Sequence, residues 1–320
     1  MNIKSSISGC LPRPPRLIST TRKYDRSRIN EEELEEAYRT YTKEVIDYQV
    51  EQGLTYINDG YLRRQDLLRP FTTKLNGVET GQLYRWYNNN TFYRIPVIKG
   101  KLEGEAPFNE TYLDLLPKAE YKAVLPAPYT FVKLAKNEYY ESETDFLQEI
   151  AEIINAEIKA LERQGYTYIQ LSDPALVYHK TAPSKDELSA IAAAIEIATS
   201  GVKARTGLQT YFGDIEPVLA DVLDWKVDDI GIDYYETYAD AVKEYSFKGG
   251  VSLGIVDARN TLQEDPDELV SLCNEVIDFS SPVSLMVATN CDLDFLTWEE
   301  AQHKIETVAK VAKQLKEEQQ

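Results

Sequence analysis

Apolar residues along the chain alternate between short continuous runs and longer stretches with a 3.6-residue rhythm. The short runs are rich in β-branched and aromatic residues, which favour extended backbone, and they therefore predict strands. We expect eight strands, at residues 3–8, 54–58, 121–125, 166–171, 203–210, 229–234, 251–256 and 285–289. Most of these runs are followed by a helical pattern, so strands and helices alternate along the chain.

Capping residues predict where the helices begin. At Asn30 and at Ser184 a cap residue is followed three positions later by Glu, which is the spacing of a capping box. Ser142 and Thr297 are cap residues in front of further helical patterns. We expect the tail, residues 313–320, to be frayed. The predicted helices cover residues 30–53, 142–165, 184–201 and 297–312.

Eight strands that alternate with helices fit a single (β/α)8 TIM barrel over residues 1–320. A doubly wound open sheet is the alternative. One region departs from the alternation: residues 76–104 contain four glycines and two extended runs, 83–87 and 91–98, around the polar segment 88–90. This pattern predicts a β-hairpin insertion with a polar tip after the second βα unit.

Charge and composition narrow the classes of partner. The chain has 320 residues and a formal net charge of −18, which disfavours binding to phosphate backbones and to anionic lipid surfaces. We therefore expect neither nucleic acid nor membrane as a partner. Three cysteines without metal-binding spacing, and the absence of a long apolar run, indicate a cytoplasmic protein without disulfides.

In a (β/α)8 barrel, functional side chains gather where strands end and βα loops begin. Polar residues occupy these positions after seven of the predicted strands, and we take them as candidates for a pocket. The candidates are Arg13, Asp59, Tyr61, Arg64, Ser172, Asp173, Gln209, Tyr211, Asp233, Asp257, Arg259, Asn290 and Cys291.

Several candidates have a simpler interpretation. Asp173 precedes a proline and is typical of turns, while Asp257 and Arg259 have the spacing of a loop ion pair. Cys291 follows an apolar strand and could be a small buried apolar residue. The two histidines lie away from the strand ends, which favours surface positions.

The hairpin carries an unusual density of aromatic and cationic residues. These side chains either stack on a flat ligand, dock a partner, or pack onto the barrel, and the pattern alone does not distinguish the three. The candidates for a ligand or partner surface are Arg85, Trp86, Tyr87, Asn88 and Tyr93.

Five strings in order along the chain resemble the cobalamin-independent methionine synthase family. They are residues 58–66 (NDGYLRRQD), 169–176 (IQLSDPAL), 210–212 (TYF), 254–260 (GIVDARN) and 287–293 (VATNCDL). The resemblance covers nearly the whole chain and implies a (β/α)8 barrel. In the longer family members two barrels occur: the C-terminal one binds zinc and homocysteine, the N-terminal one has lost the metal, and a methyl-carrying folate binds between them.

The resemblance also implies where zinc would bind, at positions that family members fill with His, Cys, Glu and Cys. This chain has Gln209, Tyr211, Asp233 and Cys291 there, so the donor set falls short of the three or four ligands that zinc needs. Tyr61 and Ser172 stand where the catalytic barrel has carboxylates for the amino group of homocysteine. The hairpin and the Tyr-Phe pair at 211 and 212 instead resemble the N-terminal barrel.

We therefore expect a free-standing, zinc-less N-terminal-type barrel that works with a separate zinc-bearing barrel in methyl transfer from a pterin or folate donor to homocysteine. No cofactor is expected and zinc is disfavoured. The alternative is an autonomous methyltransferase that acts on another thiol or on a corrinoid or pterin carrier. A third reading, decarboxylation as in uroporphyrinogen decarboxylases, would use Arg13, Arg64 and Arg259 to receive carboxylates.

Overall fold

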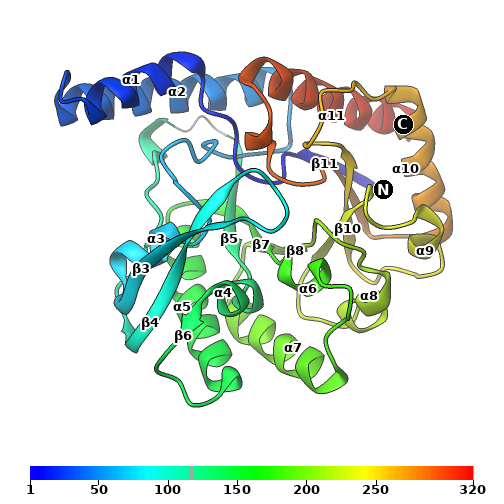
Figure 1. Ribbon diagram of the computed structural model, residues 1–320. Helices are drawn as coiled ribbons and strands as arrows, with labels where there is room; N and C mark the ends of the chain where they lie inside the picture. The colour runs from blue at the N-terminus through cyan, green and yellow to red at the C-terminus, as the bar shows by residue number, and fades with distance from the viewer. Residues whose placement is uncertain (116–118, 320) are drawn as a thin grey trace.

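The computed structural model describes residues 1–115 and 119–319. Eight parallel strands form a nearly closed barrel with helices around it (Figure 1). All eight predicted strands are present: β1 Asn2–Ser6, β2 Tyr56–Ile57, β5 Glu120–Pro126, β7 Tyr166–Ser172, β8 Arg205–Gln209, β9 Asp229–Asp233, β10 Gly250–Val256 and β11 Ser284–Thr289.

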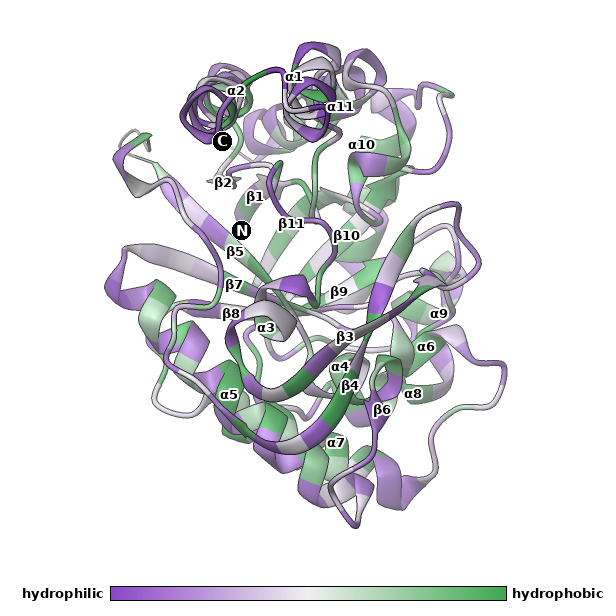
Figure 2. Ribbon diagram, turned by 60° about the vertical axis from the view of Figure 1, so that its left-hand side comes forward, coloured by the Kyte–Doolittle hydropathy of each residue, from purple (hydrophilic) through white to green (hydrophobic). Residues whose placement is uncertain are grey.

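The strands are hydrogen-bonded in the order β1-β11-β10-β9-β8-β7-β5-β2. At the seam between β1 and β2 the amide of Thr55 donates to the carbonyl of Ser5 at 3.1 Å. Every residue of β9, β10 and β11 is buried, because one face lines the barrel interior and the other packs against helices. Figure 2 shows the apolar residues concentrated on the strands and the polar residues on the outer helices. The fold prediction is confirmed.

The helices surround the barrel, and the cap residues predicted for four of them lie at the predicted starts. Asn30 and Ser184 form complete capping boxes with Glu33 and Glu187. The helices are α1 Pro15–Asp25, α2 Glu31–Glu51, α3 Arg69–Lys74, α4 Pro128–Leu134, α5 Glu143–Arg163, α6 Ala175–Tyr178, α7 Lys185–Thr199, α8 Glu216–Val222, α9 Ala239–Lys243, α10 Pro266–Ser280 and α11 Trp298–Glu318.

The expectation of a frayed tail is wrong for most of its length. Helix α11 continues to Glu318, because Val311, Ala312 and Leu315 are fully buried and hold its last turns on the barrel. Gln320 lies outside the described residues. None of the described helices combines the length and the apolar character needed to cross a bilayer.

A long hairpin lies across the carboxyl-terminal side of the barrel. Its strands β3 Asn76–Arg85 and β4 Phe92–Glu103 pair antiparallel, and β4 also pairs with the short strand β6 Lys136–Asn137. The amide of Trp86 donates to the carbonyl of Thr91 at 2.9 Å and closes the tip. The hairpin brings residues 86–92 to the mouth of the barrel.

Candidate functional site

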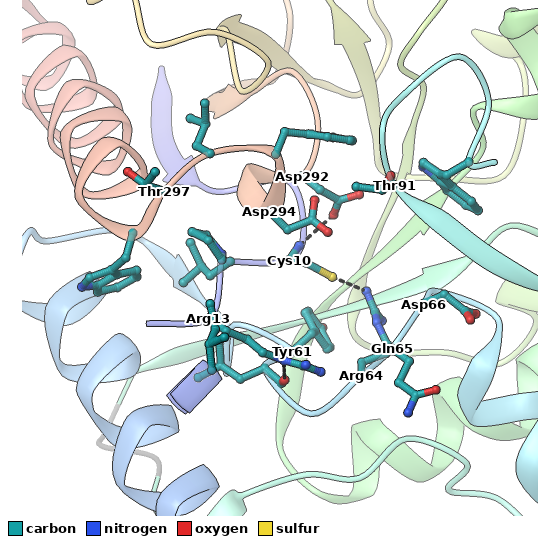
Figure 3. Close-up of a pocket in the computed structure, with 18 of the residues that line it drawn as sticks. Cys10, Arg13, Tyr61, Arg64, Gln65, Asp66, Thr91, Asp292, Asp294 and Thr297 are labelled. Atoms are coloured by element: carbon teal, nitrogen blue, oxygen red, sulfur yellow. Dashed lines mark hydrogen bonds between the residues drawn. The ribbon is translucent and has the colours of Figure 1, made fainter. Parts of the chain in front are cut away.

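The mouth of the barrel has an open cavity of about 850 Å3 on one side, which we call the rim cavity. Four segments enclose it: residues 10–18, which run from the end of β1 into α1, residues 61–67 after β2, the hairpin tip 86–92, and residues 292–299, which run from the end of β11 into α11 (Figure 3). Its aromatic walls are formed by Tyr61, Trp86, Phe92, Phe295 and Trp298.

Arg64 is fixed in the wall of the rim cavity. Its Nη1 donates to the carbonyl of Val124 at 2.9 Å, its Nη2 lies 3.1 Å from Sγ of Cys10, and its guanidinium lies 3.9 Å from the ring centroid of Tyr61. Figure 3 shows the Arg64–Cys10 contact in the middle of the cavity. Burial raises the pKa of the Cys10 thiol, so this group is a neutral thiol beside a fixed cation.

Carboxylates and a second arginine complete the polar lining. The amide of Cys10 donates to Oδ1 of Asp292 at 2.7 Å, and Asp294 lies two residues further along the same wall. Nε of Arg13 donates to the carbonyl of Leu62 at 2.6 Å. The rim cavity therefore combines flat aromatic surfaces with both donors and acceptors, which suits a polar heteroaromatic ligand.

A smaller cavity of about 460 Å3 adjoins the rim cavity and shares Tyr61 and Arg64 with it. Asp59 lies in this second cavity, where its carboxylate accepts the amide of Tyr61 at 3.0 Å. Burial raises the pKa of Asp59. The second cavity is further lined by Arg63, Arg69 and Lys74.

The centre of the mouth, by contrast, is filled. Gln209, Tyr211, Asp233 and Cys291 are each at most 2% exposed, and we call this group the mouth centre. Phe212 covers it. The ring of Phe212 lies 4.6 Å from that of Tyr211, and 5.9 Å and 6.1 Å from the rings of Tyr87 and Phe295 respectively.

The mouth centre does not have the donor set of a zinc site. Oδ2 of Asp233 accepts the amide of Phe212 at 3.1 Å, and its Oδ1 accepts the amide of Tyr235 at 3.1 Å and Nδ2 of Asn290 at 3.2 Å. Burial raises the pKa of the Cys291 thiol well above its ordinary value. Within residues 1–115 and 119–319, no three His, Cys, Asp or Glu side chains are grouped to hold a metal. Gln209 and Tyr211 do not supply the missing ligands.

The remaining strand-end candidates lie in buried hydrogen-bond networks around the mouth centre. Oδ1 of Asp173 accepts the hydroxyl of Thr130 at 2.6 Å, and burial raises the pKa of Asp173 to about 7. Ser172 accepts Nε2 of Gln170 at 3.0 Å. Asn290 joins Asp233 to Asp257, donating to Oδ1 of Asp257 at 3.3 Å.

The predicted ion pair between Asp257 and Arg259 is present, but Arg259 lies closer to Glu236. Arg259 Nε lies 3.8 Å from Asp257, whereas Arg259 Nη2 lies 2.8 Å from a carboxylate oxygen of Glu236. Both histidines, His179 and His303, are exposed, as expected for surface positions.

Some of the candidate hairpin residues pack against the barrel, and others are exposed to solvent. The ring of Tyr87 lies 4.6 Å from that of Tyr178, and Tyr93 is buried with its hydroxyl 3.3 Å from the carbonyl of Leu134. Trp86 is 7% exposed and lines the rim cavity. Arg85 and Asn88 are exposed. The packing interpretation thus holds for the inward-facing aromatic residues, while the exposed cation and amide remain candidates for a partner surface.

Residues 5–314 match the family described as cobalamin-independent synthase, catalytic domain. The chain belongs to this family. Among curated relatives, the methionine synthase of Pyrococcus horikoshii is 28% identical over 324 residues, covering 99% of this chain and 94% of that protein. The methionine synthase of Saccharolobus solfataricus is 25% identical over 324 residues, covering 99% of this chain and 96% of that protein.

Solved structures show the same fold. A B12-independent methionine synthase from Shewanella, in complex with selenomethionine, aligns with a TM-score of 0.81 at 20% identity and 98% coverage of both chains. A putative B12-independent methionine synthase from Listeria monocytogenes aligns with a TM-score of 0.80 at 20% identity, covering 98% of this chain and 99% of that one. The family barrel is therefore retained.

Sequence reasoning missed part of the rim cavity of this family member. Asp294, Phe295 and Trp298 were not among the candidates, because they lie beyond the strand end, in the connection to α11 and at the first residue of that helix. The available signal was the pair of aromatic residues on either side of the cap residue Thr297. Aromatic side chains in a βα loop at the catalytic end of a barrel are candidates for ligand contact.

Proposed function

We propose that this family member is a barrel without a catalytic metal that assists a separate zinc-bearing barrel in cobalamin-independent methionine synthesis. The observation that carries the proposal is the contrast between the filled mouth centre, which lacks a zinc donor set, and the open rim cavity beside it. A barrel of this kind would hold a methyl donor at its rim and present it to a partner.

The lining of the rim cavity supports a pterin as the bound group. A pterin is flat, so it would gain from stacking on Trp86, Phe92 or Trp298. Its amino group and ring N–H groups need acceptors, which Asp292 and Asp294 supply. The carboxylates of a glutamyl tail would find cations along the same cavity system, at Arg13, Arg64 and Arg69.

The outer face of the hairpin supports a protein partner. Leu83 pairs with Arg94 across the strands, and Arg85 pairs with Phe92, so these side chains share one face. Leu83 is 57% and Phe92 is 46% exposed. Exposed apolar side chains rimmed by arginines are typical of an interface. Because Phe92 also lines the rim cavity, a partner that docks here would cover the bound donor.

The test measures methyl transfer to homocysteine by a zinc-bearing homologue from the same organism, with and without this chain. We expect the wild-type chain to raise the rate with a methylated reduced pterin, and Leu83→Glu with Phe92→Glu to abolish the effect. Leu262→Glu with Phe279→Glu is the matched control, since these side chains are 75% and 64% exposed elsewhere on the barrel. A rate that is unchanged by the wild-type chain would refute the proposal.

An autonomous methyltransferase is the second candidate, and one observation favours it. The relatives named methionine synthase align with nearly the full length of this chain, with 94% to 96% of their own length covered. In this case Cys291, Asp233, Asp173 and Tyr211 would form the working pocket, after the aromatic cover over the mouth centre has moved. Methyl transfer by the isolated chain that is lost in Cys291→Ser would select this function over the first.

A further inference from the structure

Helix α1, the connection that follows it and the start of α2 carry two patches of opposite charge. Residues 13–28 contain six arginines or lysines and one carboxylate, Asp25, in a chain whose net charge is −18. Residues 30–36 contain five glutamates. We call residues 13–36 the arm.

The arm extends beyond the barrel. In Figure 1 helices α1 and α2 lie side by side along the top of the molecule and reach past the barrel at the end where α1 passes into α2. Helix α1 buries only Leu17, and the first buried residue of α2 is Tyr38. Every residue from Arg22 to Arg28 is exposed. The end of the arm is therefore accessible on several sides.

The two patches do not neutralise each other within the chain. Among the residues that the structure describes, no carboxylate oxygen lies within 4.0 Å of a charged nitrogen of the six cations in residues 13–28. Glu31, Glu32 and Glu36 are likewise free of ion pairs within the described ranges, while Glu35 pairs with Arg63. The helix dipole favours basic residues at the end of α1 and acidic residues at the start of α2, but its influence ends within one turn. Arg28 and Glu36 lie outside those turns.

We infer that the arm is an interface between two copies of this chain. A two-fold axis places the same surface of both copies face to face, so each basic patch meets the acidic patch of its partner, and the contact forms twice. Pro14 and Leu17 are buried within the chain, so 22 of the arm's 24 residues are at least partly exposed, within the roughly 20–30 residues that a standard interface uses on each side. It is mostly polar, so the dimer is weak and depends on salt.

Salt has a specific effect on this dimer. The net charge of −18 repels the two copies at long range, whereas the patches attract at contact. At about 0.1 M salt the screening length is about 10 Å, which weakens the long-range repulsion but preserves the contacts, and at about 1 M it is about 3 Å. The dimer therefore forms near 0.1 M salt and dissociates near 1 M.

The experiment measures molar mass by light scattering and sedimentation at both salt concentrations. One variant reverses the basic patch (Arg22→Glu, Lys23→Glu, Arg26→Glu, Arg28→Glu), and the other reverses the acidic patch (Glu31→Lys, Glu32→Lys, Glu36→Lys), leaving the capping residue Glu33 in place. Each variant alone is expected to be a monomer. Their equimolar mixture is expected to recover the dimer, because the acidic arm of one then faces the basic arm of the other.

A matched control reverses the exposed lysines Lys203, Lys226 and Lys248, and this variant is expected to dimerise like the wild type. A wild-type chain that is monomeric at about 0.1 M salt would overturn the inference and leave the arm to a different partner. So would a dimer that persists in both arm variants, or a folded mixture that stays monomeric. Should a variant fail to fold, the salt series on the wild-type chain decides the question.

Discussion

The mouth centre and the rim cavity lie side by side at the same end of the barrel, yet they are built in opposite ways. Around the mouth centre, Asp233 and Asn290 are buried and bonded to backbone amides and to each other, and Phe212 covers them. In the rim cavity, Arg13 and Asp294 line an open volume of about 850 Å3. The mouth centre is therefore packed as part of the core, whereas the adjacent loops leave an open cavity.

Hydrogen bonds account for the packing of the mouth centre. A zinc site needs charged ligands held in a precise geometry, whereas a buried carboxylate needs only hydrogen-bond donors. Asp233 keeps its place because the amides of Phe212 and Tyr235 bind it. Substitutions at the mouth centre are thus expected to change stability, and substitutions at the rim to change binding.

Replacement of Phe212 by Ala gives the largest expected effect. Phe212 is 8% exposed and its ring contacts those of Tyr87, Tyr211 and Phe295, so its loss leaves a cavity over the mouth centre. We expect the free energy of unfolding to fall by about 4 kcal/mol. Both residues share the unfavourable positive φ at this position, +69°, so the comparison isolates packing.

Urea unfolding at neutral pH measures this effect, with Phe279→Ala as the control. Phe279 is 64% exposed and its loss is expected to change the free energy of unfolding by less than about 0.5 kcal/mol. Equal effects of the two substitutions would show that the aromatic cover is not part of the core.

The titration of Asp173 gives the next expected effect, a dependence of the free energy of unfolding on pH. Burial raises its pKa to about 7, well above the value of about 3.9 in an unfolded chain. Between these values the native state holds a proton that the unfolded state does not, so the free energy of unfolding decreases as pH rises from about 4 to about 7. The full decrease is on the order of 4 kcal/mol.

Replacement of Asp173 by Asn removes this titration while keeping an acceptor for the hydroxyl of Thr130. Urea unfolding of both proteins at several pH values is expected to show the wild-type chain losing stability relative to the variant as pH rises. Parallel pH profiles would mean that Asp173 has an ordinary pKa in the folded protein.

The strands and the best-capped helices could be predicted from sequence because their signals are local. Continuous apolar runs such as 251–256 and the capping box at Ser184 need no tertiary information. The cover over the mouth centre could not be predicted, since Tyr87 and Phe212 meet only in the folded chain, 125 positions apart. For the same reason, the sequence placed Cys291 at a strand end without indicating whether it is open or covered.

Replacement of Asp233 by Ala has a smaller expected effect on stability than the first two. It leaves the amides of Phe212 and Tyr235 and the side-chain amide of Asn290 without their acceptor, but it also removes a carboxylate whose pKa burial raises. The net loss is about 2 kcal/mol. Asp233→Asn, which retains one acceptor oxygen, is expected to lose about half as much. An increase in stability in the Ala variant would indicate that Asp233 is kept for a role other than structure.

The rim gives the smallest change in stability and the clearest change in binding. Replacement of Phe92 by Ala removes a ring that is 46% exposed, so the free energy of unfolding should change by less than about 0.5 kcal/mol. Under the proposed function the same ring stacks on the pterin, and its loss should weaken pterin binding about tenfold. Calorimetric titration of a reduced pterin against the wild-type chain, Phe92→Ala and the control Phe279→Ala separates the two effects. If Phe92→Ala bound the pterin as tightly as the wild type, the pterin would not stack on Phe92. The rim cavity would then need a different ligand to qualify as the binding site beside the packed mouth centre.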